Sequence, residues 1–249
     1  MCRWRFTVRS EKRRKKRAER PSFFAAEGGA ALRCETRYPL LLAHGAGCRD
    51  TRGCWGPIPA ALRREGARVF LGGEDAVGSI EAGAARLALR ARVAMAKTGA
   101  GKVNIIAHSK GGLEARLLAG DPALSGRIAS ITTIGTPHGG AAAMDFLCAL
   151  PDPLHRAIAA GVDLFFGLTG DRRPDFYRLV HGLTRGACQS LPPAPEFCCQ
   201  SFGSAMRRPG QDLLLAPLWL PLLLTDGPND GTLCFADFPA SVFTAILCS

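Results

Sequence analysis

Short apolar runs alternate with segments of helical periodicity between residues 38 and 134, and this alternation constrains the fold most. The expected strands are short, apolar and often β-branched, and they cover residues 39–43, 67–71, 103–107 and 128–134. The expected helices carry apolar residues on one face and cover residues 58–66, 79–97 and 112–119. Strands that alternate with helices are typical of a parallel sheet with helical crossovers. We therefore expect an α/β fold.

Charge divides the chain into two parts. The formal net charge is +11, but residues 1–20 hold ten basic and two acidic residues, which leaves only +3 for the rest. We expect residues 1–36 to form a disordered basic arm and residues 37–249 to form one folded domain. A helical pattern at residues 145–187 interrupts the alternation and indicates an insertion over the sheet, either a lid or an ordinary packed helix. Because the domain is almost neutral, we expect no nucleic-acid binding by it.

Cysteine content and apolar runs bear on the compartment. The ten cysteines make up about 4% of the chain and show no paired CxxC spacing, so we expect most of them to be free, buried thiols. The basic N-terminus is not followed by an apolar run of signal-peptide length. The longest apolar stretch, residues 213–224, contains two prolines and is too short to span a bilayer, and we expect its residues 220–224 to return to the sheet. We expect a cytoplasmic protein without a transmembrane segment.

A serine stands between an expected strand and an expected helix, in the sequence Ala-His-Ser-Lys-Gly at residues 107–111. The small residues Ala107 and Gly111 permit a sharp strand-to-helix turn that exposes the Oγ of Ser109. This pattern predicts a nucleophile elbow. A serine nucleophile also needs a base and two N–H donors for the oxyanion. The candidate donors are the backbone amides of Lys110 and of Ala46, although the glycine loop that holds Ala46 would pass for a plain turn if read alone.

Several motifs in order resemble those of the bacterial true lipases, the triacylglycerol lipases of Pseudomonas and Burkholderia type, and most closely their clostridial relatives. The shared segments include the His-Gly loop, the serine motif and an Asn-Asp-Gly turn, and they lie at residues 38–45, 55–59, 101–116, 132–140 and 228–231. The resemblance covers residues 38–233. It implies an α/β-hydrolase fold, a mostly parallel sheet flanked by helices, with residues 145–187 as a lid-like helical insertion.

The resemblance also implies roles for single residues. Ser109 becomes the nucleophile, Ala46 and Lys110 the oxyanion donors, and Asp230 the acid that orients the base. No cofactor is implied for the chemistry, but such lipases hold a structural calcium through two aspartates. Asp212, eighteen residues before Asp230, fits the first of them, and a single carboxylate does not make a calcium site.

The histidines depart from the family pattern. The family's catalytic histidine follows the acid, whereas none of the five histidines here follows Asp230, so we expect the C-terminal histidine segment to be lacking. His108 directly precedes the nucleophile, and we expect its side chain to be directed elsewhere. His44 and His138 belong to motifs that shape the site, and His155 and His181 lie in the insertion.

Two functions remain open at this stage. The first is a serine carboxylic-ester hydrolase of the lipase kind, which cleaves acylglycerols or related acyl esters through an acyl-enzyme on Ser109 and contacts lipid at an interface. The second is a catalytically dead or truncated hydrolase-fold protein that binds lipid or a partner. The elbow, the His-Gly loop and the Asn-Asp-Gly turn, which occur in this order, favour the first function. The missing histidine motivates the second, since loss of the base from such a triad costs about a million-fold in turnover.

Overall fold

The computed structural model describes residues 34–193, 199–211, 216–234, 237 and 243–248. The remaining residues lie outside this description, among them residues 1–33 of the expected arm and Asp212.

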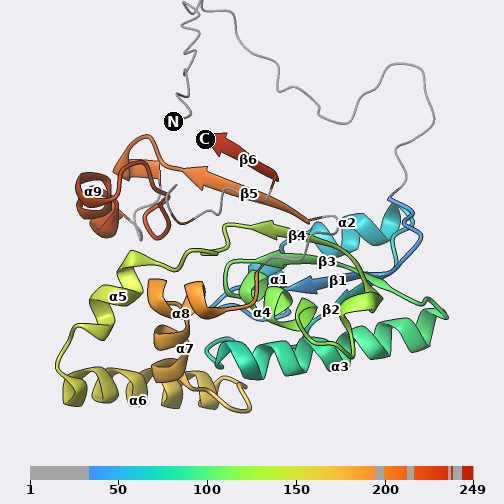
Figure 1. Ribbon diagram of the computed structural model, residues 1–249, viewed down its shortest axis with the longest axis horizontal. Coiled ribbons are helices and arrows are strands. Elements are labelled where there is room, and N and C mark those ends of the chain that lie inside the picture. The colour runs from blue at the N-terminus through green and yellow to red at the C-terminus, as the bar shows by residue number, and fades with distance from the viewer. Residues whose placement is uncertain (1–33, 194–198, 212–215, 235–236, 238–242, 249) are drawn as a thin grey trace, which may run out of the picture. The chain divides into compact units, whose positions relative to one another are not determined.

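Six parallel strands form one sheet at the centre of the domain, in the order β2-β1-β3-β4-β5-β6 (Figure 1). The strands are β1 Leu40–Ala43, β2 Val69–Leu71, β3 Val103–His108, β4 Ile128–Ile134, β5 Cys199–Ala205 and β6 Phe243–Cys248. The first four match the strands expected from the sequence to within two residues. The parallel α/β sheet is thereby confirmed.

Helices cover both faces of the sheet. On one face α3 (Ile80–Thr98) and α4 (Lys110–Ala119) pack against strand residues such as Val103 and Ile105. On the other face α1 (Arg52–Trp55) and α2 (Ile58–Arg64) cover β1 and β2 through Trp55 and Leu62. The sheet is therefore buried on both sides, which explains why its strands read as nearly continuous apolar runs.

The ends of α3 follow local rules. The Ser79 side chain accepts a hydrogen bond from the Ala82 amide at 3.3 Å, and Gly99 takes the left-handed conformation after the last turn. Single 3-10 turns occur at Ser125–Arg127 and Pro209–Gln211.

Four helices lie between β4 and β5 and form what we call the helical insertion. They are α5 Ala142–Cys148, α6 Asp152–Leu168, α7 Phe176–Gly182 and α8 Arg185–Ser190. They gather at the lower left of the view in Figure 1. Their apolar faces pack on the N-terminal part of α3 and on α4 through buried residues including Leu113, Leu179 and Leu183. The insertion thus shares an apolar core with α3 and α4.

The structure corrects one expectation about the sheet. Residues 220–224 belong to the helix α9 (Ala216–Thr225) and do not return to the sheet, which β5 and β6 complete instead. A short leucine-rich run has no period that separates a buried strand from a buried helix, and leucine favours the helix.

The described cysteines are mostly free. Cys48 and Cys54 form a disulfide, whereas Cys34, Cys148, Cys188 and Cys234 are free. Of these four thiols, Cys188 and Cys234 are buried.

None of the described helices combines the length and the apolar content that a transmembrane helix requires.

Candidate active site

Ser109 occupies the sharp turn between β3 and α4. Its backbone has φ 50° and ψ −122°, and among the described non-glycine residues it alone has a positive φ. Such a conformation costs about 1–3 kcal/mol and persists only where the surroundings impose it. Here the Ser109 amide donates to the Ile134 carbonyl at 2.9 Å, and Thr136 Oγ1 donates to the Ser109 carbonyl at 3.0 Å. The geometry is that of the expected nucleophile elbow.

Glycines let the neighbouring loops approach this turn. A Cβ on Gly111 would lie 2.7 Å from the His44 carbonyl oxygen and 2.8 Å from that of Ala43. A Cβ on Gly45 would lie 2.9 Å from the Cβ of Ser109. All three distances are shorter than ordinary van der Waals contact, so the loop after β1 can approach the elbow this closely only because both positions are glycine.

The two expected oxyanion donors lie on either side of the elbow. Ala43 of β1 pairs with Ala107 of β3, so the loop that carries Ala46 leaves the sheet directly beside Ser109. Lys110 is the first residue of α4, where an amide has no acceptor within its own helix. The positive end of the α4 dipole also faces this position. The arrangement suits an anion next to Ser109.

Asp230 reaches the same edge of the sheet through the end of β5. The Met206 amide, just after β5, donates to the Asn229 carbonyl at 2.8 Å. Asp230 Oδ1 accepts hydrogen bonds from the amides of Thr232 and Leu233 and from the Thr232 hydroxyl, at 2.8–2.9 Å. These bonds fix the carboxylate in a turn at the carboxyl ends of the parallel strands, where α/β proteins place their ligands.

A pocket of about 340 Å³ joins the nucleophile and the acid. Ser109, Asp230 and His108 line it together with apolar side chains from β4 and β5, among them Ile134 and Phe202. The expectation that His108 points elsewhere is therefore wrong. Its ring fits beside the loop after β1 because Gly45 has no side chain: an added Cβ there would lie 2.7 Å from the Nδ1 atom of His108.

Asp230 acts electrostatically on His108. Desolvation by the surrounding atoms lowers the pKa of the His108 imidazole below its ordinary value, and the His44 ring adds to this effect. The carboxylate of Asp230 opposes it and raises the pKa of the same ring. The imidazole is therefore neutral at neutral pH, the form that can accept a proton.

The other four histidines lie outside the lining of the Ser109 pocket. His44 is buried, and its Nε2 lies 3.1 Å from the Glu74 carbonyl oxygen. His138 Nε2 lies 3.1 Å from Thr133 Oγ1, and burial together with the nearby Arg116 lowers the pKa of His138 to about 4. His155 and His181 belong to the helical insertion. Among the described residues, His108 is thus the histidine that lines the pocket.

A buried ionic cluster underlies the elbow, and the sequence patterns did not indicate it. The Lys110 ammonium pairs with Glu114 one turn along α4, and both side chains are fully buried. Glu74 lies near the pair, with Oε2 3.6 Å from His44 Nε2. Burial, and secondarily the charge of Glu114, holds the pKa of Glu74 well above its ordinary value. Buried charges need partners, so this cluster ties the elbow to the loop that carries His44.

Comparison with curated proteins agrees with the geometry. The triacylglycerol lipase of Burkholderia plantarii is 38% identical over 138 residues, which cover 52% of this chain and 37% of that protein. The triacylglycerol lipase of Vibrio cholerae is 38% identical over 117 residues, or 45% of this chain and 36% of that protein. Over about half of its length, this chain is similar to bacterial triacylglycerol lipases. The resemblance found in the sequence motifs is confirmed.

The extent of the family match is limited. The aligned part of the chain spans little more than a third of the length of these relatives, 37% and 36%. No family model matches the chain.

Solved structures confirm the α/β-hydrolase fold of this chain. A Bacillus licheniformis lipase in its mature form aligns with a TM-score of 0.62 and 17% identity, over 85% of this chain and 83% of that one. A metagenomic carboxyl esterase aligns with a TM-score of 0.60 and 17% identity, over 90% of this chain and 66% of that one. At these identities the likeness concerns the fold alone.

Asp212, the residue expected to be the first calcium ligand, lies outside the described residues. The calcium site therefore stays a prediction.

Proposed function

We propose that this chain is a serine carboxylic-ester hydrolase of the lipase kind, with Ser109 as its nucleophile. One observation carries the proposal. Among the described non-glycine residues, Ser109 alone has a positive φ, and it shares a pocket with Asp230 and His108. Nucleophile, acid and imidazole are the three groups that acyl transfer by serine requires. The similarity to triacylglycerol lipases over about half of the chain supports ester hydrolysis as well.

In the proposed reaction, Ser109 Oγ attacks the acyl carbon of an ester and gives its proton to the base. The tetrahedral oxyanion accepts hydrogen bonds from the amides of Ala46 and Lys110. The base returns the proton to the departing alcohol, which leaves an acyl-enzyme. Water then attacks this ester, the acid is released and Ser109 regains its proton. The chemistry needs no cofactor.

We propose that His108 is the base and that the Asp230 carboxylate stabilises its protonated form. The imidazole lines the pocket of Ser109, is neutral at neutral pH, and becomes easier to protonate under the influence of the Asp230 charge. Transfer of the Ser109 proton would produce an imidazolium, which this carboxylate stabilises.

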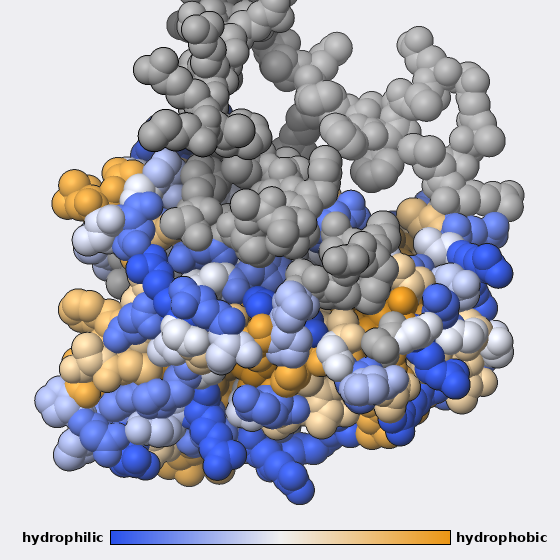
Figure 2. All heavy atoms as spheres, in the orientation of Figure 1, coloured by the Kyte–Doolittle hydropathy of each residue, from blue (hydrophilic) through white to orange (hydrophobic). Residues whose placement is uncertain are grey.

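Acyl-ester lipids are the proposed substrates, and an apolar surface supports contact with lipid. Phe146 on α5 and Leu164, Phe165 and Leu168 on α6 are exposed, each by 60% or more. Leu220 and Leu224 of α9 are exposed as well, and apolar side chains gather over α9 at the upper left of Figure 2. Large exposed apolar side chains in such numbers are typical of surfaces that bind lipid or protein.

The cytoplasmic location expected from the sequence stays a prediction. The Cys48–Cys54 disulfide weighs against it, since structural disulfides are rare in reducing compartments.

Hydrolysis of short- and long-acyl p-nitrophenyl esters by the purified chain tests the proposal, with Ser109→Ala as the inactive reference. We expect Ser109-dependent turnover and a preference for long acyl chains. His108→Ala separates the base from the nucleophile: equal loss in both variants supports His108, whereas loss in Ser109→Ala alone places the base elsewhere. Rates that match Ser109→Ala in the unaltered chain would instead favour the second function, a lipid-binding protein without catalysis.

A further inference from the structure

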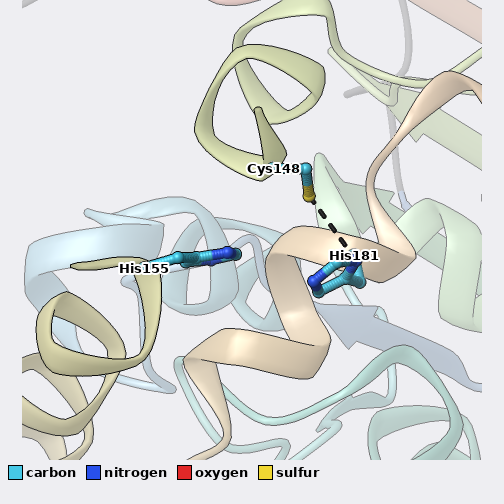
Figure 3. A group of neighbouring side chains, drawn as sticks. All are labelled: Cys148, His155 and His181. Carbon is cyan, nitrogen blue, oxygen red and sulfur yellow. Dashed lines mark hydrogen bonds between the residues drawn. The ribbon is translucent and has the colours of Figure 1, made fainter. Parts of the chain in front are cut away.

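Three side chains with metal-binding atoms converge in the helical insertion, away from the Ser109 pocket. Cys148 is the last residue of α5, His155 lies in the first turn of α6, and His181 lies in the last turn of α7. One ligand atom from each residue lies within 4.8 Å of the other two. Figure 3 shows the three side chains coming from three different helices toward a common point. Neither the fold nor the proposed ester chemistry requires this arrangement.

His155 gives the strongest indication of a bound ligand. Its residue is only 2% exposed, yet its Nε2 has no hydrogen-bond partner in the described structure. A buried imidazole nitrogen without a partner costs free energy, so one normally binds a donor, an acceptor or a metal. In Figure 3 the ring extends from α6 toward His181. The two ring centroids lie 5.4 Å apart.

The spacing of the three groups matches a tetrahedral zinc ion. Zn–S and Zn–N bonds of about 2.3 and 2.0 Å at a tetrahedral angle place sulfur and nitrogen about 3.5 Å apart. Cys148 Sγ lies 3.5 Å from His181 Nδ1. Two imidazoles on one tetrahedral zinc have ring centroids about 5 Å apart, close to the value for His155 and His181.

The donor types select the metal. A thiolate and two imidazoles suit a borderline-soft ion such as zinc and are poor ligands for calcium or magnesium, which prefer oxygen. His181 is exposed, so an ion can enter from solvent. Asp152 and Arg156, the charged side chains beside the neighbouring Tyr177, pair with each other and leave no net charge that would repel a cation.

We propose that Cys148, His155 and His181 bind a zinc ion that links α5, α6 and α7 of the helical insertion. Water occupies the fourth position. On binding, the Cys148 thiol loses its proton to solvent, the S–H bond is replaced by a Zn–S bond, and no oxidation occurs. The ion pins the three helices at one point and satisfies the buried nitrogen of His155. The inference is independent of the ester chemistry, since no group of the Ser109 pocket takes part.

Metal content and stability test the proposal on the full chain, purified without a polyhistidine tag, stripped with chelator and reloaded with zinc chloride. We expect one zinc per chain after desalting, a higher Tm with zinc, and a thiolate-to-metal charge-transfer band when cobalt replaces zinc. Cys148→Ser and His181→Asn should each weaken zinc binding by about 100-fold or more. Cys34→Ser, which alters another free and partly buried cysteine, should bind zinc like the unaltered chain.

His181→Asn carries the test if variants of the buried His155 fail to fold, because an exposed side chain at this position tolerates substitution. Zinc that does not remain on the unaltered chain would overturn the proposal and leave a thiol–imidazole hydrogen bond. Zinc retained equally by Cys148→Ser and His181→Asn would overturn it as well. Because the readouts are metal content, Tm and the cobalt spectrum, failure of the ester hydrolase proposal would not alter them.

Discussion

Arg49 and Asp171 form an ion pair with 2.9 Å between Nη2 and Oδ1, and the pair links the loop after β1 to the end of α6. Arg49 also donates from Nη2 to the Phe166 carbonyl at 2.9 Å, and Asp171 Oδ2 accepts from the Val77 amide at 3.0 Å. Asp171 is nearly buried. The pair therefore connects the segment next to the proposed oxyanion loop with the helical insertion.

Removal of one partner should destabilise the domain. Asp171→Ala removes the carboxylate that pairs with the Arg49 guanidinium and leaves the Val77 amide without its acceptor. We expect the free energy of unfolding to fall by about 3 kcal/mol. Arg156→Ala is the matched control, because its pair with Asp152 is exposed and should contribute little to stability. Urea denaturation measures both. Equal effects in the two variants would show that the Arg49–Asp171 pair does not hold the insertion.

The buried pair on α4 gives a second prediction. Lys110→Met leaves Glu114 buried without its cation, and we expect a loss of about 3–5 kcal/mol of folding free energy. Lys110→Met combined with Glu114→Gln removes the unpaired charge and should recover most of that loss. Denaturant midpoints of the single and double variants decide the matter. A double variant no more stable than the single one would contradict this interpretation of the cluster.

Stability should fall on mild acidification because of His138. Its pKa is about 4 in the folded protein, against about 6.5 for an unfolded chain, so the unfolded state binds the extra proton as pH falls through 6.5. From pH 7 to pH 5 this residue should remove about 2 kcal/mol of stability. His138→Gln, which cannot titrate, should show a weaker loss by that amount. Parallel pH dependence in both proteins would exclude the effect.

The pH profile of ester hydrolysis tests His108 as the base. Burial lowers its pKa, so the acidic limb of kcat/KM should have its midpoint below the ordinary histidine value of about 6.5. Asp230 raises the same pKa, so Asp230→Asn should move the remaining limb to still lower pH. The measurement is kcat/KM of a p-nitrophenyl ester from pH 4 to 8. A limb at or above 6.5, or one that Asp230→Asn leaves in place, would contradict the assignment.

Much of the fold could be predicted from the sequence because its local signals agree. The strand β1 is a short apolar run that ends at a glycine-containing loop, and β3 is one that leads through Ser109 into α4. The helix α3 begins at a serine cap and ends at glycine. The elbow at Ser109 follows from the small residues on either side. Such features depend on neighbours in sequence, which is why they could be read without a structure. The segment 216–225 has no such signal, and its helix was missed.

Other features depend on tertiary packing and could not be predicted. The position of His108 depends on Gly45, which belongs to another loop and leaves room for its ring. The convergence of Cys148, His155 and His181 needs three helices to meet, and their spacings of seven and 26 residues match no metal-binding motif. The pairing of Lys110 with Glu114 has ordinary helical spacing, and only burial by the surrounding loops distinguishes it from an exposed pair.

Covalent labelling of Ser109 tests the central claim most directly. The purified chain is incubated with a p-nitrophenyl alkylphosphonate, which reacts with an activated serine, and the product is digested and analysed by mass spectrometry. We expect one adduct per chain, on the peptide that contains Ser109, with none in Ser109→Ala. A folded chain that takes up no phosphonate, or that carries the adduct on another residue, would contradict the assignment of Ser109 as the nucleophile.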